Sequence, residues 1–164
     1  MNIEFDNLKL TRYSDEYNYI KDELENGISK SSYIHDIGKR LEASKNKENI
    51  FDSAFIVSDD DNSVGYLFIS NSRNDEVFLE YALLKDFRGM GYARELVENV
   101  TNYLFDEHNI RSIRLDIDPS NEASMNVAEA CGFVEDEEEY ASRNYCGRIQ
   151  FVKDSYNYIS KRSK

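Results

Sequence analysis

The segment EVFLEYALL, at positions 76–84, limits the possible folds of this chain more than any other, because it is apolar at nearly every position. Such a run is typical of a strand that is buried on both faces, inside a sheet that other elements cover. A glycine turn, RGMGYA at 88–93, follows the run, and apolar side chains then recur at helical spacing as far as Leu104. The sequence therefore predicts a buried strand, a turn and a long amphipathic helix from Gly91 to about Glu107.

The remaining segments alternate between strands and helices. Strands are predicted at 8–14, 51–59, 63–70, 112–118, 139–146 and 149–159, and helices at 15–26, 32–45 and from Asn121 to a cap at Gly132. Asp60–Asn62 supplies turn residues for a hairpin, and the inward face of the last helix is predicted at Ala123, Val127 and Ala130. Because the chain has no internal repeat and no linker, the pattern indicates one mixed α/β domain over 1–164.

The composition excludes several classes of protein. The formal charge of −12, from 32 acidic and 20 basic residues, disfavours a nucleic-acid partner and is compatible with a cationic substrate. No apolar run approaches the roughly 18 residues that span a membrane, and the N-terminus lacks the pattern of a signal peptide, so a cytoplasmic protein is predicted. Cys131 and Cys146 form no CxxC pair, and we expect them to be reduced and to bind no metal.

The glycine turn at the start of the long helix has the chemistry of an anion site. Glycine lets backbone N–H groups approach a ligand, and the positive end of the helix dipole favours negative charge, so phosphate is the natural guest. Arg88 and Arg94 would add positive charge. Arg94 stands where a G-x-G-x-x-G dinucleotide fingerprint requires glycine, and the chain lacks the Gly-Lys-Ser/Thr ending of a phosphate loop. A turn that merely joins strand and helix remains an alternative.

Two motifs carry a resemblance to a known family. Arg88-x-x-Gly91-x-Ala93 matches the R/Q-x-x-G-x-G/A signature of the GNAT acyltransferases, and NEASMNVAEACGF at 121–133 resembles the second motif of that family. The spelling is most similar to the RimJ/RimL-type ribosomal-protein N-terminal acetyltransferases. The resemblance implies the GNAT acyl-CoA N-acyltransferase fold, with a central, mostly antiparallel sheet and helices on both faces. It also implies acetyl-CoA as co-substrate, without a metal.

The same resemblance implies which residues hold acetyl-CoA. Its pantetheine arm would pair with the backbone of 81–83 as an added strand does, and its pyrophosphate would lie on the amides of 89–93. The expected cofactor-binding residues are Tyr81, Ala82, Leu83, Arg88, Gly89, Met90, Gly91, Tyr92, Ala93, Arg94 and Asn121.

Acetyl transfer to an amine needs a base and an acid. Only the neutral amine attacks a thioester, and deprotonating an alkylammonium at pH 7 costs about 4–5 kcal/mol. Glu80, the lone charge inside the buried strand, and Asp116, on the strand 112–118, are the candidate bases. Many family members have a tyrosine as general acid seven residues after the asparagine that begins the second motif, and this chain has Ala128 there. The resemblance implies that Ser124 is the general acid instead. A structural salt bridge at Glu80 and an ordinary helix-start serine remain alternatives.

The leading hypothesis is an N-acetyltransferase that acts on a primary amine: a protein N-terminus, a polyamine or a small amino compound. The acidic run EDEEE at 135–139 could attract a cationic acceptor, although such a run is more often a solvated loop. The alternatives are a non-catalytic acyl-CoA-binding or sensing module, suggested by Ala128, and a nucleotide-binding protein. No membrane partner is expected, and a homodimer is a possible assembly.

Overall fold

The computed structural model describes residues 2–27, 37–73, 75–136, 149–156 and 158. Its strands are β1 (Asn2–Glu4), β2 (Lys9–Arg12), β3 (Ser53–Ser58), β4 (Ser63–Arg73), β5 (Glu76–Leu83), β6 (Ser112–Ile117), β7 (Val134–Glu135) and β8 (Ile149–Asp154). Its helices are α1 (Asn18–Gly27), α2 (Ile37–Ser44), α3 (Tyr92–Glu107) and α4 (Glu122–Ala130), with two short 3-10 turns, η1 (Asp15–Tyr17) and η2 (Lys85–Phe87).

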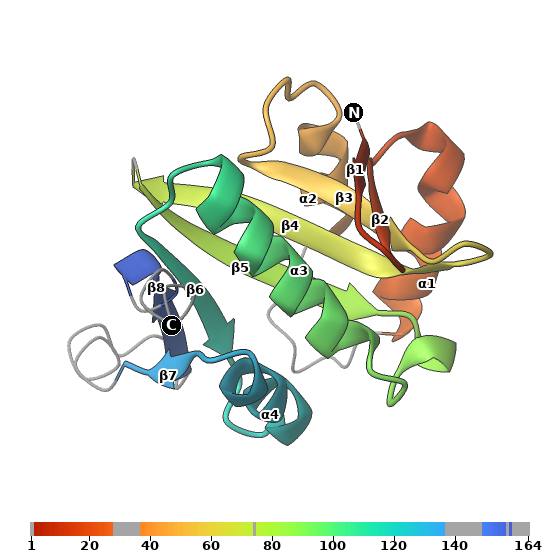
Figure 1. Cartoon of the computed structure of the whole chain (residues 1–164). Coiled ribbons are helices and arrows are strands. Elements are labelled where there is room, and N and C mark those ends of the chain that lie inside the picture. Colours follow the sequence, from red (N-terminus) through yellow and green to blue (C-terminus); the bar gives the residue numbers. More distant parts are fainter. Residues whose placement is uncertain (1, 28–36, 74, 137–148, 157, 159–164) are drawn as a thin grey trace. The chain divides into compact units, whose positions relative to one another are not determined.

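Within the described residues, eight strands are hydrogen-bonded in the order β1-β2-β3-β4-β5-β6-β8-β7 (Figure 1). The chain divides into a first unit, Met1–Ser70 with Glu80–Tyr92, and a second unit, Asn71–Leu79 with Ala93–Lys164. Strands β4 and β5 contribute residues to both units, and each unit is described by itself. The single domain over 1–164 stays a prediction.

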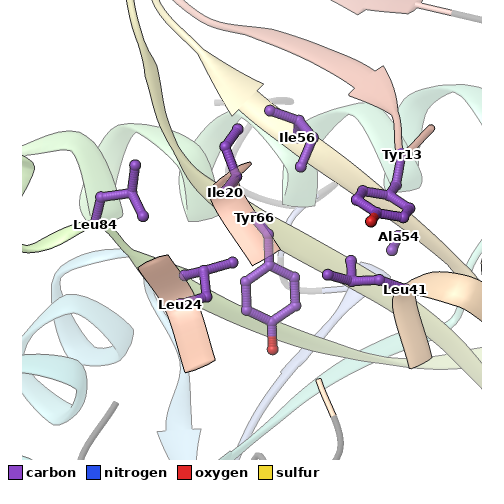
Figure 2. Packing of buried hydrophobic residues seen from close by; sticks show 8 residues of the cluster. All are labelled: Tyr13, Ile20, Leu24, Leu41, Ala54, Ile56, Tyr66 and Leu84. Atoms are coloured by element: carbon purple, nitrogen blue, oxygen red, sulfur yellow. The ribbon is translucent and has the colours of Figure 1, made fainter. Parts of the chain in front are cut away.

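In the first unit, β1 to β4 pair antiparallel in chain order, and α1 and α2 pack on them. Two residues of α1 and one of α2 meet strand residues in a buried cluster (Figure 2). The cluster consists of Tyr13, Ile20, Leu24, Leu41, Ala54, Ile56, Tyr66 and Leu84. Burial of each large apolar side chain contributes about 1.5–3 kcal/mol, so this cluster holds the two helices to the sheet.

In the second unit, β6 pairs parallel with β5 and antiparallel with β8, and β8 pairs with the short strand β7. Ile113, Leu115 and Ile117 are buried, as the alternation in β6 predicts. The buried face of α3 consists of Leu96, Val97, Val100, Thr101 and Leu104. The predicted helical period is therefore confirmed, and so is the predicted burial of β5, which has no exposed residue.

Two short strands and one helix face differ from the sequence prediction. The sequence does not predict β1 and β7, because strands of three and two residues are too short to show an alternating pattern. The predicted inward face of α4 is wrong, since Ala123 and Ala130 are exposed while Ala128 is fully buried. Small residues occur all around this helix, so the spacing of apolar residues did not show that Ala128 and Cys131 are the buried ones.

The C-terminal prediction is correct in part. The strand predicted at 149–159 begins as expected but ends at Asp154, and residues 155 and 156 are helical. The strand predicted at 139–146 lies outside the described residues. Gly132 has φ +86°, which confirms the left-handed cap after α4.

Gly65 allows β4 and β5 to come unusually close together within the first unit. A Cβ at this position would lie 2.2 Å from the carbonyl oxygen of Ala82 and 3.0 Å from the Cα of Leu83. Both contacts are to backbone, so no side chain could turn away to relieve them. The spacing of the two strands therefore depends on the missing side chain.

Asp59 connects the β3–β4 turn to the first residue of α3. Its Oδ1 accepts the N–H groups of Asp61, at 2.9 Å, and Asn62, at 2.7 Å, which confirms the predicted hairpin turn. Its Oδ2 accepts the hydroxyl of Tyr92 at 2.6 Å, and the Tyr92 ring lies edge-on to Phe87. The hydrogen bond from Tyr92 is the main reason that the pKa of Asp59 is below its usual value of 3.8.

We expect Gly65→Ala to lower the free energy of unfolding by about 1–3 kcal/mol, because the new methyl group forces the backbones of β4 and β5 apart. Chemical denaturation of the variant and the wild type gives this difference. A free energy of unfolding within about 0.5 kcal/mol of the wild-type value would contradict this prediction, because it would show that β4 and β5 accommodate the methyl group without loss of stability.

We expect Tyr92→Phe to lower the free energy of unfolding by about 1 kcal/mol at pH 7, since a hydrogen bond to Asp59 is lost. A carboxyl group whose pKa is lower in the folded than in the unfolded state stabilises the fold at pH values above its unfolded-state pKa. This stabilisation is lost as the pH falls through the folded-state pKa. The difference between variant and wild type should therefore shrink below pH 3.8. Denaturation at pH 7 and pH 3 measures it, and in an Asp59→Asn background the pH dependence should vanish.

Candidate active site

The carboxyl end of β5 leads through η2 into the glycine turn, all within the first unit. Tyr81, Ala82 and Leu83 form the last three residues of the strand. Arg88 turns back toward the strand, because its Nε donates to the carbonyl oxygen of Leu83 at 3.1 Å. The strand end, Arg88 and the turn are therefore brought together, as the sequence predicts for the cofactor-binding residues.

The glycine turn is open and has unused hydrogen-bond donors. Gly89 and Gly91 have φ of +76° and +88°, in the left-handed region that favours glycine, and a Cβ on either would meet nothing within 4 Å. In the described part of the chain, the N–H groups of Gly89, Met90 and Gly91 donate to no protein acceptor. These donors precede the first turn of α3 at Tyr92, so the residues present fit an anionic group such as a pyrophosphate.

Glu80 is held by two donors in the first unit. Its Oε2 forms an ion pair with Nη1 of Arg40 on α2 and accepts the hydroxyl of Tyr66 at 3.4 Å. The Glu80 side chain is 11% exposed and that of Arg40 33%. The sequence predicts a lone charge here, and no local pattern could show its partner, because Arg40 lies 40 residues away. The role of Glu80 as a base stays a prediction.

A cavity of about 400 Å³ lies in the first unit between α1 and the segment that leads into the glycine turn. Its lining is charged and apolar. The lining residues are Asp22, Glu23, Leu24, Leu83, Leu84, Lys85, Asp86, Phe87 and Arg88. Three carboxylates, two cations and four apolar side chains give it an excess of one negative charge.

The second unit brings the end of β6 and the start of α4 together. Asp116 is half-buried and pairs with Gln150 across the strands, and its Oδ1 is fully buried. Oδ1 of Asn121 accepts the N–H of Ser124 at 3.1 Å, so Asn121 is the N-cap of α4. Ser124 is half-buried on the first helical turn. The roles of these three residues in binding and catalysis stay predictions.

Ala93 and Arg94 continue α3 in the second unit. The carbonyl oxygen of Arg94 accepts a weak hydrogen bond from Sγ of Cys131, at 3.6 Å. Cys131 is a free thiol whose pKa is raised, chiefly by burial. Cys146 lies outside the described residues.

The described part of the acidic run is tied into an ion-pair network. Nη1 of Arg114 donates to Asp136 at 2.9 Å and to Gln150 at 3.2 Å, while its Nε donates to Glu76 at 2.9 Å. Asp136 therefore has a structural partner and is not simply a solvated charge. Residues 137–139 of the run lie outside the described residues.

The described residues contain neither a cluster of metal ligands nor a membrane helix. No group of three or more His, Cys, Asp or Glu side chains in this part of the chain could hold a metal ion. None of the helices described has the length and apolar character that crossing a bilayer requires.

Comparisons with solved structures show the fold. A chimera of the spermidine N-acetyltransferase SpeG from Vibrio cholerae and hSSAT is 21% identical, with a TM-score of 0.74 over 94% of this chain and 99% of that one. A dodecameric spermidine N-acetyltransferase from Vibrio cholerae is 20% identical, with a TM-score of 0.72 over 96% and 99%. An acetyltransferase from Agrobacterium tumefaciens is 18% identical, with a TM-score of 0.73 over 93% and 94%.

Sequence comparison identifies the family. No significant match was found among curated proteins. The family model of the Acetyltransferase (GNAT) domain matches residues 7–134, most of the chain. The predicted GNAT fold is confirmed by this match and by the solved structures, and the chain belongs to the GNAT family of acetyl-CoA-dependent N-acetyltransferases.

Proposed function

We propose that the protein transfers the acetyl group of acetyl-CoA to a primary amine of an aliphatic polyamine. The observation that carries this proposal is the cavity of about 400 Å³ in the first unit. Its carboxylates at Asp22, Glu23 and Asp86 outnumber its two cations and suit ammonium groups. The half-buried ring of Phe87 suits the methylene chain between them. The net charge of −12 favours the approach of a polycation. Spermidine N-acetyltransferases among the structures of the same fold support the same class of acceptor.

The open glycine turn supports the binding of acetyl-CoA. In this proposal the N–H groups of 89–93 bind the pyrophosphate, and the guanidinium of Arg88 adds positive charge. The backbone of 81–83 pairs with the pantetheine arm. That Asn121 and Arg94 also bind the cofactor stays a prediction. Acetyl-CoA supplies the activated acetyl group, and the residues of this chain orient it.

The chemistry requires one proton acceptor and one proton donor. Glu80 or Asp116 accepts a proton from the ammonium group, directly or through water, which leaves the amine free to attack. A C–N bond then forms at the thioester carbonyl carbon, and the C–S bond breaks. Ser124 gives its proton to the leaving thiolate and regains one from the attacking nitrogen, which loses its second proton as it becomes an amide. The products are CoA and the acetylated amine, and the first proton stays on the carboxylate base.

One observation favours a second candidate function, a non-catalytic acyl-CoA-binding module. Ala128 occupies the position of the tyrosine acid of many GNAT enzymes, and it is fully buried within α4. It can neither donate a proton nor be replaced by a larger donor without repacking. CoA release with any amine excludes this candidate. The RimJ/RimL-type activity on protein N-termini, the cytoplasmic location and a homodimer stay predictions.

We expect Gly91→Glu to abolish acetyl-CoA binding, because it adds a carboxylate at the anion site and strains a backbone with φ of +88°. Isothermal titration calorimetry measures the affinity. Gly132→Glu is the matched control, since Gly132 has φ of +86° and carries no predicted ligand contact. Unchanged affinity in Gly91→Glu would contradict the placement of the pyrophosphate.

We expect polyamines to be acetylated faster than N-terminal peptides or aminoglycosides in a screen that measures CoA release. In the double variant Asp22→Asn and Glu23→Gln, the KM for spermidine should rise about fivefold to tenfold, because two attractive charges are lost. A monoamine acceptor of similar length is the control, and its KM should change much less. An equal rise in KM for both amines would show that these carboxylates do not bind the second ammonium group of the polyamine.

A further inference from the structure

Within the described part of the chain, only one of the two carboxylate oxygens of Glu80 accepts hydrogen bonds. Arg40 and Tyr66 both donate to Oε2, and no described donor contacts Oε1. A structural arginine–carboxylate pair frequently uses both oxygens in a bidentate arrangement. Among the described residues, the second oxygen is therefore open to another partner.

Both donors are themselves held in place by the first unit. The guanidinium of Arg40 lies over the ring of Phe68, 4.2 Å from its centroid, and the next residue of α2, Leu41, is buried in the core. Tyr66 is 3% exposed, and its hydroxyl lies at the edge of the cluster in Figure 2. Because both donors have little freedom, they fix the rotation of the carboxylate between them.

We propose that Arg40 and Tyr66 are positioning residues that hold Oε2 of Glu80, so that Oε1 receives the proton of the acceptor amine. The step moves one proton from the ammonium nitrogen to Oε1 and needs no further reactant. This inference rests on the proposed function and on Glu80 as its base.

The values of kcat and KM separate positioning from a merely structural salt bridge. In Arg40→Gln, kcat should fall about tenfold or more, because the carboxylate loses the donor that fixes its rotation, while the KM for acetyl-CoA stays unchanged.

Three further variants serve as controls. Tyr66→Phe should lower kcat less than Arg40→Gln, since it removes a neutral donor at 3.4 Å. Arg40→Lys should restore kcat only in part, because lysine lacks the planar group that lies over Phe68. Lys39→Gln removes the same charge from an exposed position of α2 and should leave kcat unchanged.

The outcomes distinguish failure of this inference from failure of the proposed function. If Arg40→Gln lowers only the melting temperature and leaves kcat unchanged, the pair is structural and the inference is wrong. If Glu80→Gln keeps the wild-type rate while Asp116→Asn loses it, Asp116 is the base, so the inference fails while acetyl transfer stands. If the wild-type protein releases no CoA with any amine, the proposed function itself fails.

Discussion

Strand β5 places two carboxylates inside the protein, and an unpaired buried carboxylate would cost several kcal/mol. An arginine from another element meets each one. Glu76 binds Arg114 of β6 in the second unit, and Glu80 binds Arg40 of α2 in the first. A hydroxyl contributes to each site, from Ser112 at 2.7 Å and from Tyr66 at 3.4 Å. The burial of β5, and with it the strand that leads into the glycine turn, therefore depends on these two charge pairs.

Local patterns predicted the parts of the molecule that local physics determines. The helical spacing of apolar residues predicted α3, and the alternation in 112–118 predicted the buried row of β6. The glycines at 89 and 91 have positive φ, as a turn into a helix requires. The residues of the candidate site around this turn could thus be placed from the sequence, since each follows its neighbours in the chain.

Interactions between distant segments could not be read in this way. Nothing near Glu80 in the sequence indicates that Arg40 of α2 forms an ion pair with it, so the sequence showed only a lone charge. The sequence around Gly65 does not show that this glycine is required. Only the structure shows that the carbonyl oxygen of Ala82 occupies the place of a side chain. Likewise, three small residues of α4 have similar hydrophobicity, and only packing decides that Ala128 is the buried one.

The rate at which the buried thiol of Cys131 reacts can report local opening within the second unit. The thiolate is the form that attacks thiol reagents, and burial raises the pKa of this thiol. Its Sγ also contacts the carbonyl oxygen of Arg94. Modification therefore requires the end of α4 to separate from α3 for a moment. In a Cys146→Ser background, the labelling rate would measure the free energy of that separation. The change in this free energy on adding acetyl-CoA would measure how strongly a bound ligand stabilises the contact between these two helices.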